Sequence, residues 1–197
     1  MCEGDDTRTA RSSIWAPSAA RRYPGSYHQG DREGTRVIGL GSDHNGFRLK
    51  GRLLSLLVER DECVRDFGVF SDTPVDYPDI AAPLAEAVRE GVIERGILVC
   101  GTGLGMAIAA NKVPGVYAAP VTDVYTARKA WESNRVQVIT LGAWMVDAPL
   151  GLAIVEAWLQ ADFRGGDSAR KVAKIRSLEM RYSRSAGRAL PVGAHPW

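Results

Sequence analysis

A cysteine followed at once by a glycine-rich loop is the feature of this sequence with the clearest chemistry. Cys100 ends the apolar run that starts at Gly96, and Gly101-Thr-Gly-Leu-Gly105 follows it. Glycines let the backbone approach an anion, and the unpaired N–H groups at the start of the next helix point toward it. A thiolate at such a position is stabilised and can act as a nucleophile or as a general base. Sequence position does not choose between these two roles.

Two plainer interpretations compete with this one. A dinucleotide-binding loop has the spacing G-x-G-x-x-G in the first βα unit, whereas this loop is G-x-G-x-G in the third unit, so nucleotide binding is disfavoured. A cysteine flanked by apolar residues is also commonly a buried strand residue. That description suits Cys63, which lies inside a strand pattern, better than it suits Cys100 at a strand end.

A second strand end carries reactive side chains. Ser42-Asp43-His44-Asn45-Gly46 follows the predicted strand 36–41. Taken alone, Asp43 could cap the next helix and His44 could be an ordinary loop residue. Ligands of parallel α/β sheets bind at the carboxyl ends of the strands, so two such ends indicate one shared site. Asp76-Tyr77-Pro78-Asp79 could likewise be a turn and a helix cap.

The elements that must position these residues follow a βα pattern, because short apolar runs alternate with longer amphipathic segments. Leu49, Leu53, Leu56 and Leu57, for example, share one helical face. Strands are predicted at 36–41, 63–67, 96–100, 116–119 and 138–141, and helices follow each of them, with closing helices at 150–159 and 169–182. The predicted fold class is α/β, a single doubly wound, Rossmann-like sheet of five parallel strands with helices on both faces.

Composition narrows the function classes. The 197 residues are 45% apolar and 24% charged, as in a soluble globular domain, and the net charge of +2 gives nucleic-acid binding no support. No apolar run is long enough to cross a membrane. The three cysteines, an odd number that includes Cys2, favour free thiols in a reducing cytoplasm. The histidines, His28, His44 and His195, have no close spacing with cysteine, so no metal site is predicted.

Both ends of the chain differ from its centre. Residues 1–34 are rich in Arg, Ser, Gly, Asp and Pro and hold no continuous apolar segment, which argues against a secretory signal. They are expected to be a disordered tail, or to result from a start codon placed too early. Residues 183–197 are punctuated by Gly and Pro and predict a loose C-terminal tail. Residues 35–182 are therefore expected to form the folded domain.

Several longer motifs resemble the type B ribose-5-phosphate isomerase family, which also includes galactose-6-phosphate and tetrulose-phosphate isomerases. The motifs are Gly41–Lys50, Asp76–Pro78, Cys100–Met106, Ile108–Gly115 and Thr122–Arg128. They occur in the family's order between Arg36 and about Arg181, most of the chain. The resemblance implies that residues 35–182 are a sugar-phosphate isomerase domain.

The resemblance also implies an aldose–ketose isomerase that needs no cofactor or metal. Cys100 would be the base that moves a proton between C1 and C2 through a cis-enediolate, and Thr102 would assist proton transfer at the sugar oxygens. The N–H groups of Gly101, Gly103 and Gly105 would hold the enediolate oxygen. The other substrate-binding residues that it implies are Asp43, His44, Tyr77, Ser133, Asn134, Arg170 and Lys171. Related enzymes are dimers or tetramers with the site between subunits, so a homodimer or homotetramer is expected.

One departure from the family concerns ring opening. Pentose-specific members usually carry histidine and asparagine where this chain has Ser133 and Asn134, and that histidine opens the furanose ring. Serine does not titrate near neutral pH and is a poor replacement. One explanation is that another group, such as His44, opens the ring. The other is that the substrate has no ring, as in a tetrose 4-phosphate, whose phosphate occupies the hydroxyl that would close a furanose. Ser133-Asn134 with Gln137–Gly142 also resembles the family's erythrulose-4-phosphate isomerases.

The other departure concerns phosphate. Trp144 and Asp167 stand at positions where the family commonly has arginine, and Lys171, beside Arg170, replaces a further arginine. Arginine offers phosphate a planar fork and lysine only a point charge. Either His44, Arg170 and Lys171 suffice, or the phosphate binds differently, or the sugar is unusual. Trp144 could stack on a sugar face or pack as an apolar side chain.

The leading prediction is therefore isomerisation of D-erythrulose 4-phosphate and D-erythrose 4-phosphate in the cytoplasm. The alternative in the same class is isomerisation of ribose 5-phosphate and ribulose 5-phosphate. A non-catalytic sugar-phosphate-binding subunit is the alternative in another class, and the presence of Cys100, Thr102 and the whole glycine loop argues against it.

Overall fold

The structure, a computed structural model, describes residues 27–28 and 36–183. The tails predicted at 1–34 and 183–197 lie outside the described residues, apart from Tyr27, His28 and Ser183. Within the described ranges, no helix is both long and apolar enough to span a membrane.

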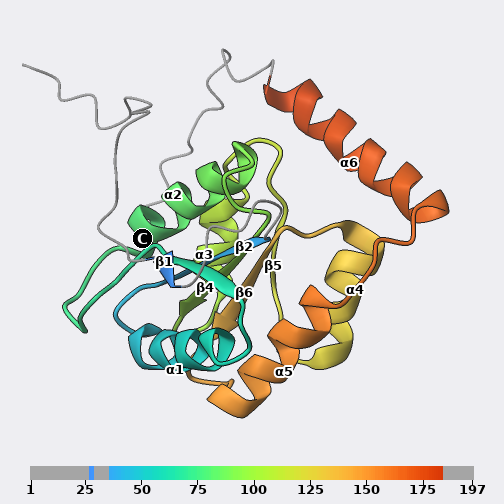
Figure 1. The fold of residues 1–197 in the computed structure, drawn as a ribbon. Helices are drawn as coiled ribbons and strands as arrows, with labels where there is room; N and C mark the ends of the chain where they lie inside the picture. Colours follow the sequence, from blue (N-terminus) through green and yellow to red (C-terminus); the bar gives the residue numbers. More distant parts are fainter. Residues whose placement is uncertain (1–26, 29–35, 184–197) are drawn as a thin grey trace, which may run out of the picture.

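A six-stranded sheet forms the centre of the molecule, with the strand order β1-β3-β2-β4-β6-β5 (Figure 1). The strands are β1 Tyr27–His28, β2 Val37–Ser42, β3 Cys63–Asp66, β4 Arg95–Cys100, β5 Ala118–Pro120 and β6 Val138–Gly142. Strands β2 to β6 are all parallel, which confirms the predicted five-stranded parallel sheet. β1 adds an antiparallel pair at the edge, beside β3, that the sequence pattern did not predict.

Helices cover both faces of the sheet, as predicted for a doubly wound fold (Figure 1). They are α1 Phe47–Val58, α2 Tyr77–Arg89, α3 Leu104–Ala110, α4 Val124–Asn134, α5 Ala148–Leu159 and α6 Gly166–Ser183. One apolar cluster joins α1, α4 and α5 to the sheet, and a second joins α2 and α3 to the opposite face. All six residues of β4 are buried, as expected for a central parallel strand covered on both sides.

The strand order creates a switch point between β2 and β4. The chain moves outward from β2 to β3 and then returns to the other side of β2 to form β4. At such a point the connections leave the two strand ends in opposite directions and open a crevice at the carboxyl edge of the sheet. The carboxyl ends of β2 and β4, which precede Asp43 and the glycine loop, therefore lie next to each other.

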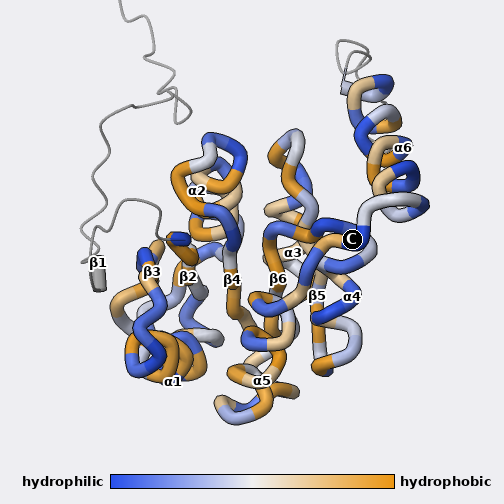
Figure 2. Tube along the Cα trace, turned by 45° about the vertical axis from the view of Figure 1, so that its right-hand side comes forward, coloured by the Kyte–Doolittle hydropathy of each residue, from blue (hydrophilic) through white to orange (hydrophobic). Residues whose placement is uncertain are grey.

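The last helix is packed differently from the other five. No residue of α6 is buried, and its large apolar side chains at Ile175, Leu178, Met180 and Tyr182 are exposed. It extends from the body of the molecule beside α4 (Figure 1), and hydrophobic residues are interspersed with hydrophilic ones along it (Figure 2). Helices of proteins owe most of their stability to packing of an apolar face, and α6 has little of that within this chain.

Candidate active site

Cys100 lies where the prediction placed it, at the carboxyl end of the central strand. It is the last residue of β4, its side chain is buried with 5% exposed, and it pairs with Gly142 of the neighbouring β6. The backbone N–H of Gly103 donates a hydrogen bond to its Sγ at 3.1 Å. This hydrogen bond holds the sulfur against the start of the glycine loop, which is the arrangement that the sequence predicted.

The glycine loop is held in one conformation by its neighbours. Gly103 has a φ of +81°, a region that glycine enters without strain, and it caps the start of α3. Its carbonyl accepts a hydrogen bond of 2.8 Å from the buried Thr140 hydroxyl on β6. The loop N–H groups are therefore fixed relative to the cysteine before any ligand binds, which is the condition for an effective anion hole.

Two aromatic rings lie against the two ends of this loop. A Cβ atom added at Gly101 would lie 2.7 Å from the Trp144 ring, and one added at Gly105 would lie 2.8 Å from the Tyr77 ring. A side chain at either glycine would therefore have to displace an aromatic ring. No pattern in a single sequence pairs these residues, and the contacts appear only in the folded chain.

The end of β2 brings a carboxylate beside the cysteine's strand. The Asp43 side chain is buried, its Oδ1 accepts from the Gly46 N–H at 3.0 Å, and its own N–H donates to the Val99 carbonyl at 3.2 Å. His44 accepts from the Val75 N–H at its Nδ1 over 3.3 Å. Its Nε2 lies 3.1 Å from the Asn45 side-chain amide nitrogen in an exposed contact, so a substrate that uses Nε2 has to displace that amide.

A buried ion pair supports this edge of the sheet and was not singled out from the sequence. Lys50 Nζ lies 2.7 Å from Asp66 Oδ2 and donates to the Val69 carbonyl at 2.8 Å. The Gly68–Val69 segment in turn exchanges backbone hydrogen bonds with Ser42 at the end of β2. Removing one member of such a pair leaves an uncompensated buried charge, so we assign it a supporting role.

The predicted site residues fall into two groups. Eight of them lie at the carboxyl edge of the sheet: Asp43, His44, Tyr77, Cys100, Gly101, Thr102, Gly103 and Gly105. Thr102 is exposed at the mouth of the loop, where its hydroxyl accepts weakly from the Leu104 N–H at 3.4 Å. This carboxyl-edge group joins the cysteine, a carboxylate, a histidine and the loop N–H groups.

The other four residues lie at the opposite, amino edge. Helix α4 carries the chain back from the end of β5 to the start of β6, so Ser133 and Asn134 in its last turn are at the amino edge. The Arg164 N–H donates to the Glu132 carbonyl at 3.1 Å, which places the start of α6, with Arg170 and Lys171, at the same edge. Strands of five or six residues separate the edges by about 15–20 Å. One chain therefore does not bring this amino-edge group to Cys100.

Two cavities of the described part lie near the amino-edge group. One of about 430 Å³ lies beside Asn134, between α4 and α6, and includes Tyr117, Lys129 and Ile175 in its lining. Burial raises the pKa of Tyr117, with a further contribution from Glu179. This cavity is closed on the α6 side only by an exposed helix.

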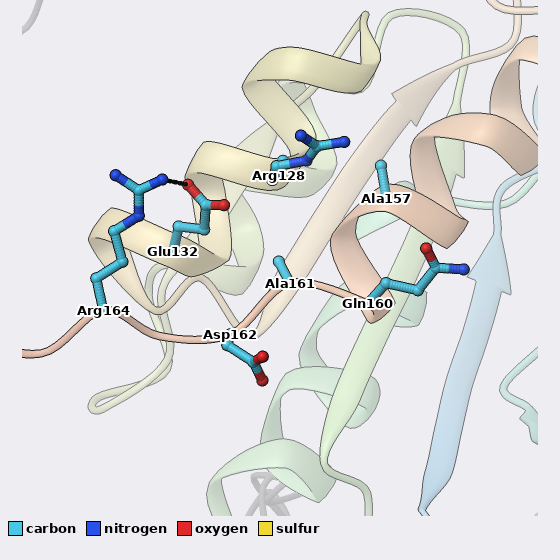
Figure 3. Close-up of a pocket in the computed structure, with 7 residues that line it drawn as sticks. All are labelled: Arg128, Glu132, Ala157, Gln160, Ala161, Asp162 and Arg164. Carbon is cyan, nitrogen blue, oxygen red and sulfur yellow. Dashed lines mark ion pairs between the residues drawn. The ribbon is translucent and has the colours of Figure 1, made fainter.

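The other cavity, of about 380 Å³, lies between α4 and α5 (Figure 3). It is lined by Arg128, Glu132, Ala157, Gln160, Ala161, Asp162 and Arg164. Glu132 pairs with Arg164 at 3.1 Å, and the hydrogen bond from Lys129, followed by the charge of Arg164, lowers the pKa of Glu132. The charges of its two arginines and two carboxylates cancel. None of the predicted site residues lines this cavity, so it is not the predicted reaction site.

The fold and these side chains are those of an α/β enzyme with its candidate active site at the switch point of the sheet. Over residues 27–28 and 36–183, no cluster of three or more His, Cys, Asp or Glu side chains could hold a metal ion.

Comparison with known proteins identifies the family. A model of the Ribose/Galactose Isomerase family matches residues 38–175. Ribose-5-phosphate isomerase B of Escherichia coli is 40% identical over 146 residues, covering 74% of this chain and 98% of the relative. D-erythrulose-4-phosphate isomerase of Pectobacterium atrosepticum is 44% identical over 140 residues, covering 70% and 91%. The solved ribose-5-phosphate isomerase B of Clostridium thermocellum has a TM-score of 0.73 at 47% identity, covering 74% of this chain and 99% of that one.

This chain belongs to the Ribose/Galactose Isomerase family. It is an enzyme, a sugar-phosphate isomerase, as the sequence resemblance predicted.

Proposed function

We propose that this enzyme interconverts D-erythrulose 4-phosphate and D-erythrose 4-phosphate, with Cys100 as the base. The observation that carries the proposal is the Gly103 N–H directed at Cys100 Sγ, together with a serine, Ser133, at the position of the ring-opening group. The relative from Pectobacterium atrosepticum that bears this activity in its name is 44% identical.

The proposed reaction is a proton transfer within one sugar. The Cys100 thiolate removes the proton from C2 of the aldose, and the electron pair forms the C1–C2 double bond of a cis-enediolate. Negative charge on the former carbonyl oxygen is held by the N–H groups of Gly101, Gly103 and Gly105. Thr102 passes a proton between the two oxygens, and the Cys100 thiol returns its proton to C1 to give the ketose. Atoms and electrons balance without an added reactant.

The main alternative is isomerisation of ribose 5-phosphate, the activity named for the Escherichia coli relative. It requires a group that opens the furanose ring. His44 is the candidate at the carboxyl edge, but the Val75 N–H occupies its Nδ1, and the Asn45 side-chain amide lies 3.1 Å from its Nε2. Ring opening needs one proton delivered to the ring oxygen and another removed from the anomeric hydroxyl. This geometry favours a substrate without a ring.

We propose that the enzyme works as a homodimer or a higher homo-oligomer with its sites between subunits. Cys100 and the amino-edge group Ser133, Asn134, Arg170 and Lys171 lie at opposite edges of the same sheet. A second copy placed against the carboxyl edge would supply that group to the cysteine. The exposed apolar side chains of Leu104 and Ile108 on α3, and those of α6, offer the surface for this contact.

A cysteine base must stay reduced, and this requirement suits the cytoplasm. Oxidation of the thiolate beyond the sulfenic acid is irreversible in most proteins, whereas cytoplasmic thiols are kept reduced by dedicated systems. We therefore propose cytoplasmic action.

A parallel initial-rate assay tests the substrate. Purified enzyme is assayed on D-erythrulose 4-phosphate and on ribose 5-phosphate, with Cys100→Ala as the blank, and kcat/KM is compared. We expect a preference for the tetrulose of at least about tenfold, and we expect Ser133→His to raise the ribose 5-phosphate rate because it adds a titratable group. A preference for the pentose in the parent enzyme would assign ring opening to another residue, with His44→Asn as the next variant. Activity on neither sugar would contradict the proposal.

A further inference from the structure

Trp144 is the large side chain closest to the backbone that follows the reactive cysteine. Three atoms of its six-membered ring lie 2.7 to 2.9 Å from the position that a Cβ on Gly101 would occupy. The indole therefore lies directly against the first peptide unit after Cys100, and a side chain at position 101 would have to displace the ring. Trp144 belongs to the turn after β6, which lies at the same carboxyl edge of the sheet as Cys100.

Backbone hydrogen bonds hold the turn that carries this ring. The Ala143 N–H donates to the Cys100 carbonyl at 2.8 Å, and the Trp144 N–H donates to the Gly101 carbonyl at 3.1 Å. Because the turn is bound to Cys100 and Gly101, the fold holds the Trp144 backbone next to the end of β4.

The exposure of Trp144 contrasts with that of the other tryptophans in the described part. Trp158 is completely buried, and Trp131 is partly buried and stacks on the Arg95 guanidinium with 3.6 Å between the charge and the ring centre. Trp144 is 70% exposed, so one side of the ring rests on the glycine and most of the rest is open. An open aromatic face beside the proposed reactive centre is a binding surface for an apolar group.

We propose that Trp144 is a specificity residue, and this inference rests on the proposed sugar-phosphate isomerase reaction at Cys100. The open face of the indole packs against the C–H groups at the C1–C2 end of the carbon chain, while the hydroxyls point to the loop N–H groups. Contact with the ring excludes water from the enediolate and so strengthens the hydrogen bonds of the anion hole. An uncharged ring offers the phosphate no counter-charge, so the phosphate is directed to the cationic side chains at the far end of the substrate.

The substrate class follows from this arrangement. A short, open-chain polyhydroxy carbonyl compound with a terminal phosphate has its reacting end on the indole and its charge directed away from it. A second negative group at C1 or C2 would be desolvated against the ring and rejected. Arg170 and Lys171, cationic side chains of the amino-edge group, are the candidates for the phosphate end.

Three variants in the full-length enzyme test the role of the ring: Trp144→Phe, which keeps an aromatic face, Trp144→Ala, which removes it, and Val92→Ala as the control. Val92 is a half-exposed apolar side chain in the turn after α2, on the amino side of the sheet. Loss of an aromatic contact of this kind is expected to raise KM for D-erythrulose 4-phosphate about tenfold in Trp144→Ala, with a smaller rise in Trp144→Phe and none in the control. Oligomer size is measured for each variant by light scattering.

A fluorescence titration gives a readout that does not depend on turnover. D-erythritol 4-phosphate, a non-reacting reduced analogue that carries no charge at C1 or C2, is added to the parent enzyme and to Trp144→Phe. We expect a change in tryptophan emission in the parent that is absent from Trp144→Phe while the analogue still binds, as followed by calorimetry.

The outcomes separate this inference from the proposed reaction. A KM for Trp144→Ala within twofold of the parent value, or equal emission changes in both proteins, overturns the role of the ring and leaves the isomerase reaction in place. A variant that becomes monomeric also overturns it, because the ring would then belong to the subunit contact. If the parent enzyme isomerises neither sugar phosphate, the proposed reaction fails, and the fluorescence arm alone decides whether Trp144 contacts the ligand.

Discussion

The two edges of the sheet differ in how completely a single chain builds them. At the carboxyl edge, Cys100 is buried and bonded to a loop whose N–H and carbonyl groups are already engaged with β6. At the amino edge, Asn134, Arg170 and Lys171 are exposed, and α6 has no buried residue. Cys100 and its loop are thus held in place by backbone geometry. The groups proposed to hold the substrate's oxygens and phosphate are instead open to solvent, and Arg170 among them pairs with the neighbouring Asp167 at 3.3 Å.

This difference follows from the kind of interaction that each task needs. Stabilising an enediolate requires donors fixed within fractions of an ångström, which short backbone connections at a strand end provide. Binding the remote end of a substrate needs less exact placement, so long side chains, including those of a second subunit, can provide it. A closed two-fold contact between copies would present the amino-edge group of each chain to the carboxyl edge of the other.

The largest expected effect is at the reacting atom. Cys100→Ala should lower kcat/KM by at least about 100-fold, because a general base contributes that much or more. Cys63, equally buried but in β3 and away from the loop, supplies the matched control. Cys63→Ala should keep full activity and lose about 1 kcal/mol of unfolding free energy to the smaller side chain, as measured by chemical denaturation. Comparable activity in the two variants would remove Cys100 from the role of base.

Mixing two inactive variants tests whether the edges meet between chains. Cys100→Ala disables the carboxyl edge, and Asn134→Ala is expected to disable the amino edge with a loss of at least about tenfold. Random exchange of subunits makes half of the dimers mixed, and each mixed dimer has one intact site if the site is shared. We expect about a quarter of the parent activity in an equimolar mixture prepared by co-refolding. No recovery, with mixed dimers verified by two affinity tags, would place both groups in one chain's site.

Alanine variants of two glycines distinguish an effect of loop geometry on the rate from a general loss of stability, and the expected change in rate is smaller than for Cys100→Ala. Gly103 and Gly115 both have positive φ, +81° and +87°, but a Cβ at Gly103 meets β6 atoms at 3.2 Å whereas one at Gly115 meets nothing. Each alanine variant should lose about 1–2 kcal/mol of stability through the left-handed backbone. Only Gly103→Ala should also lower kcat, by about tenfold, since it displaces the N–H that faces Cys100. Equal losses of activity in both variants would show that rate merely follows stability.

The order of strands and helices could be predicted from the sequence, because the pattern of apolar residues differs between strands and helices. The continuous apolar run before Cys100 indicated a central strand, and all six residues of β4 are buried. The leucines of α1 share one face, and Leu49, Leu53 and Leu57 are buried. The two-residue β1 has too few residues to show any period, and its pairing with β3 comes from a distant segment.

The sequence by itself determined that a thiol and a glycine loop end the same strand, because residue type and local order suffice for that. Tertiary structure alone decided that Trp144 and Tyr77 pack against Gly101 and Gly105, since these contacts join segments separated by about 30 to 45 residues. It also decided that Ser133 and Cys100 lie at opposite edges, because a helix that crosses between parallel strands reverses the direction of the chain. Local periodicity reports which face of an element is buried, and only the packing of all elements sets which ends of them meet.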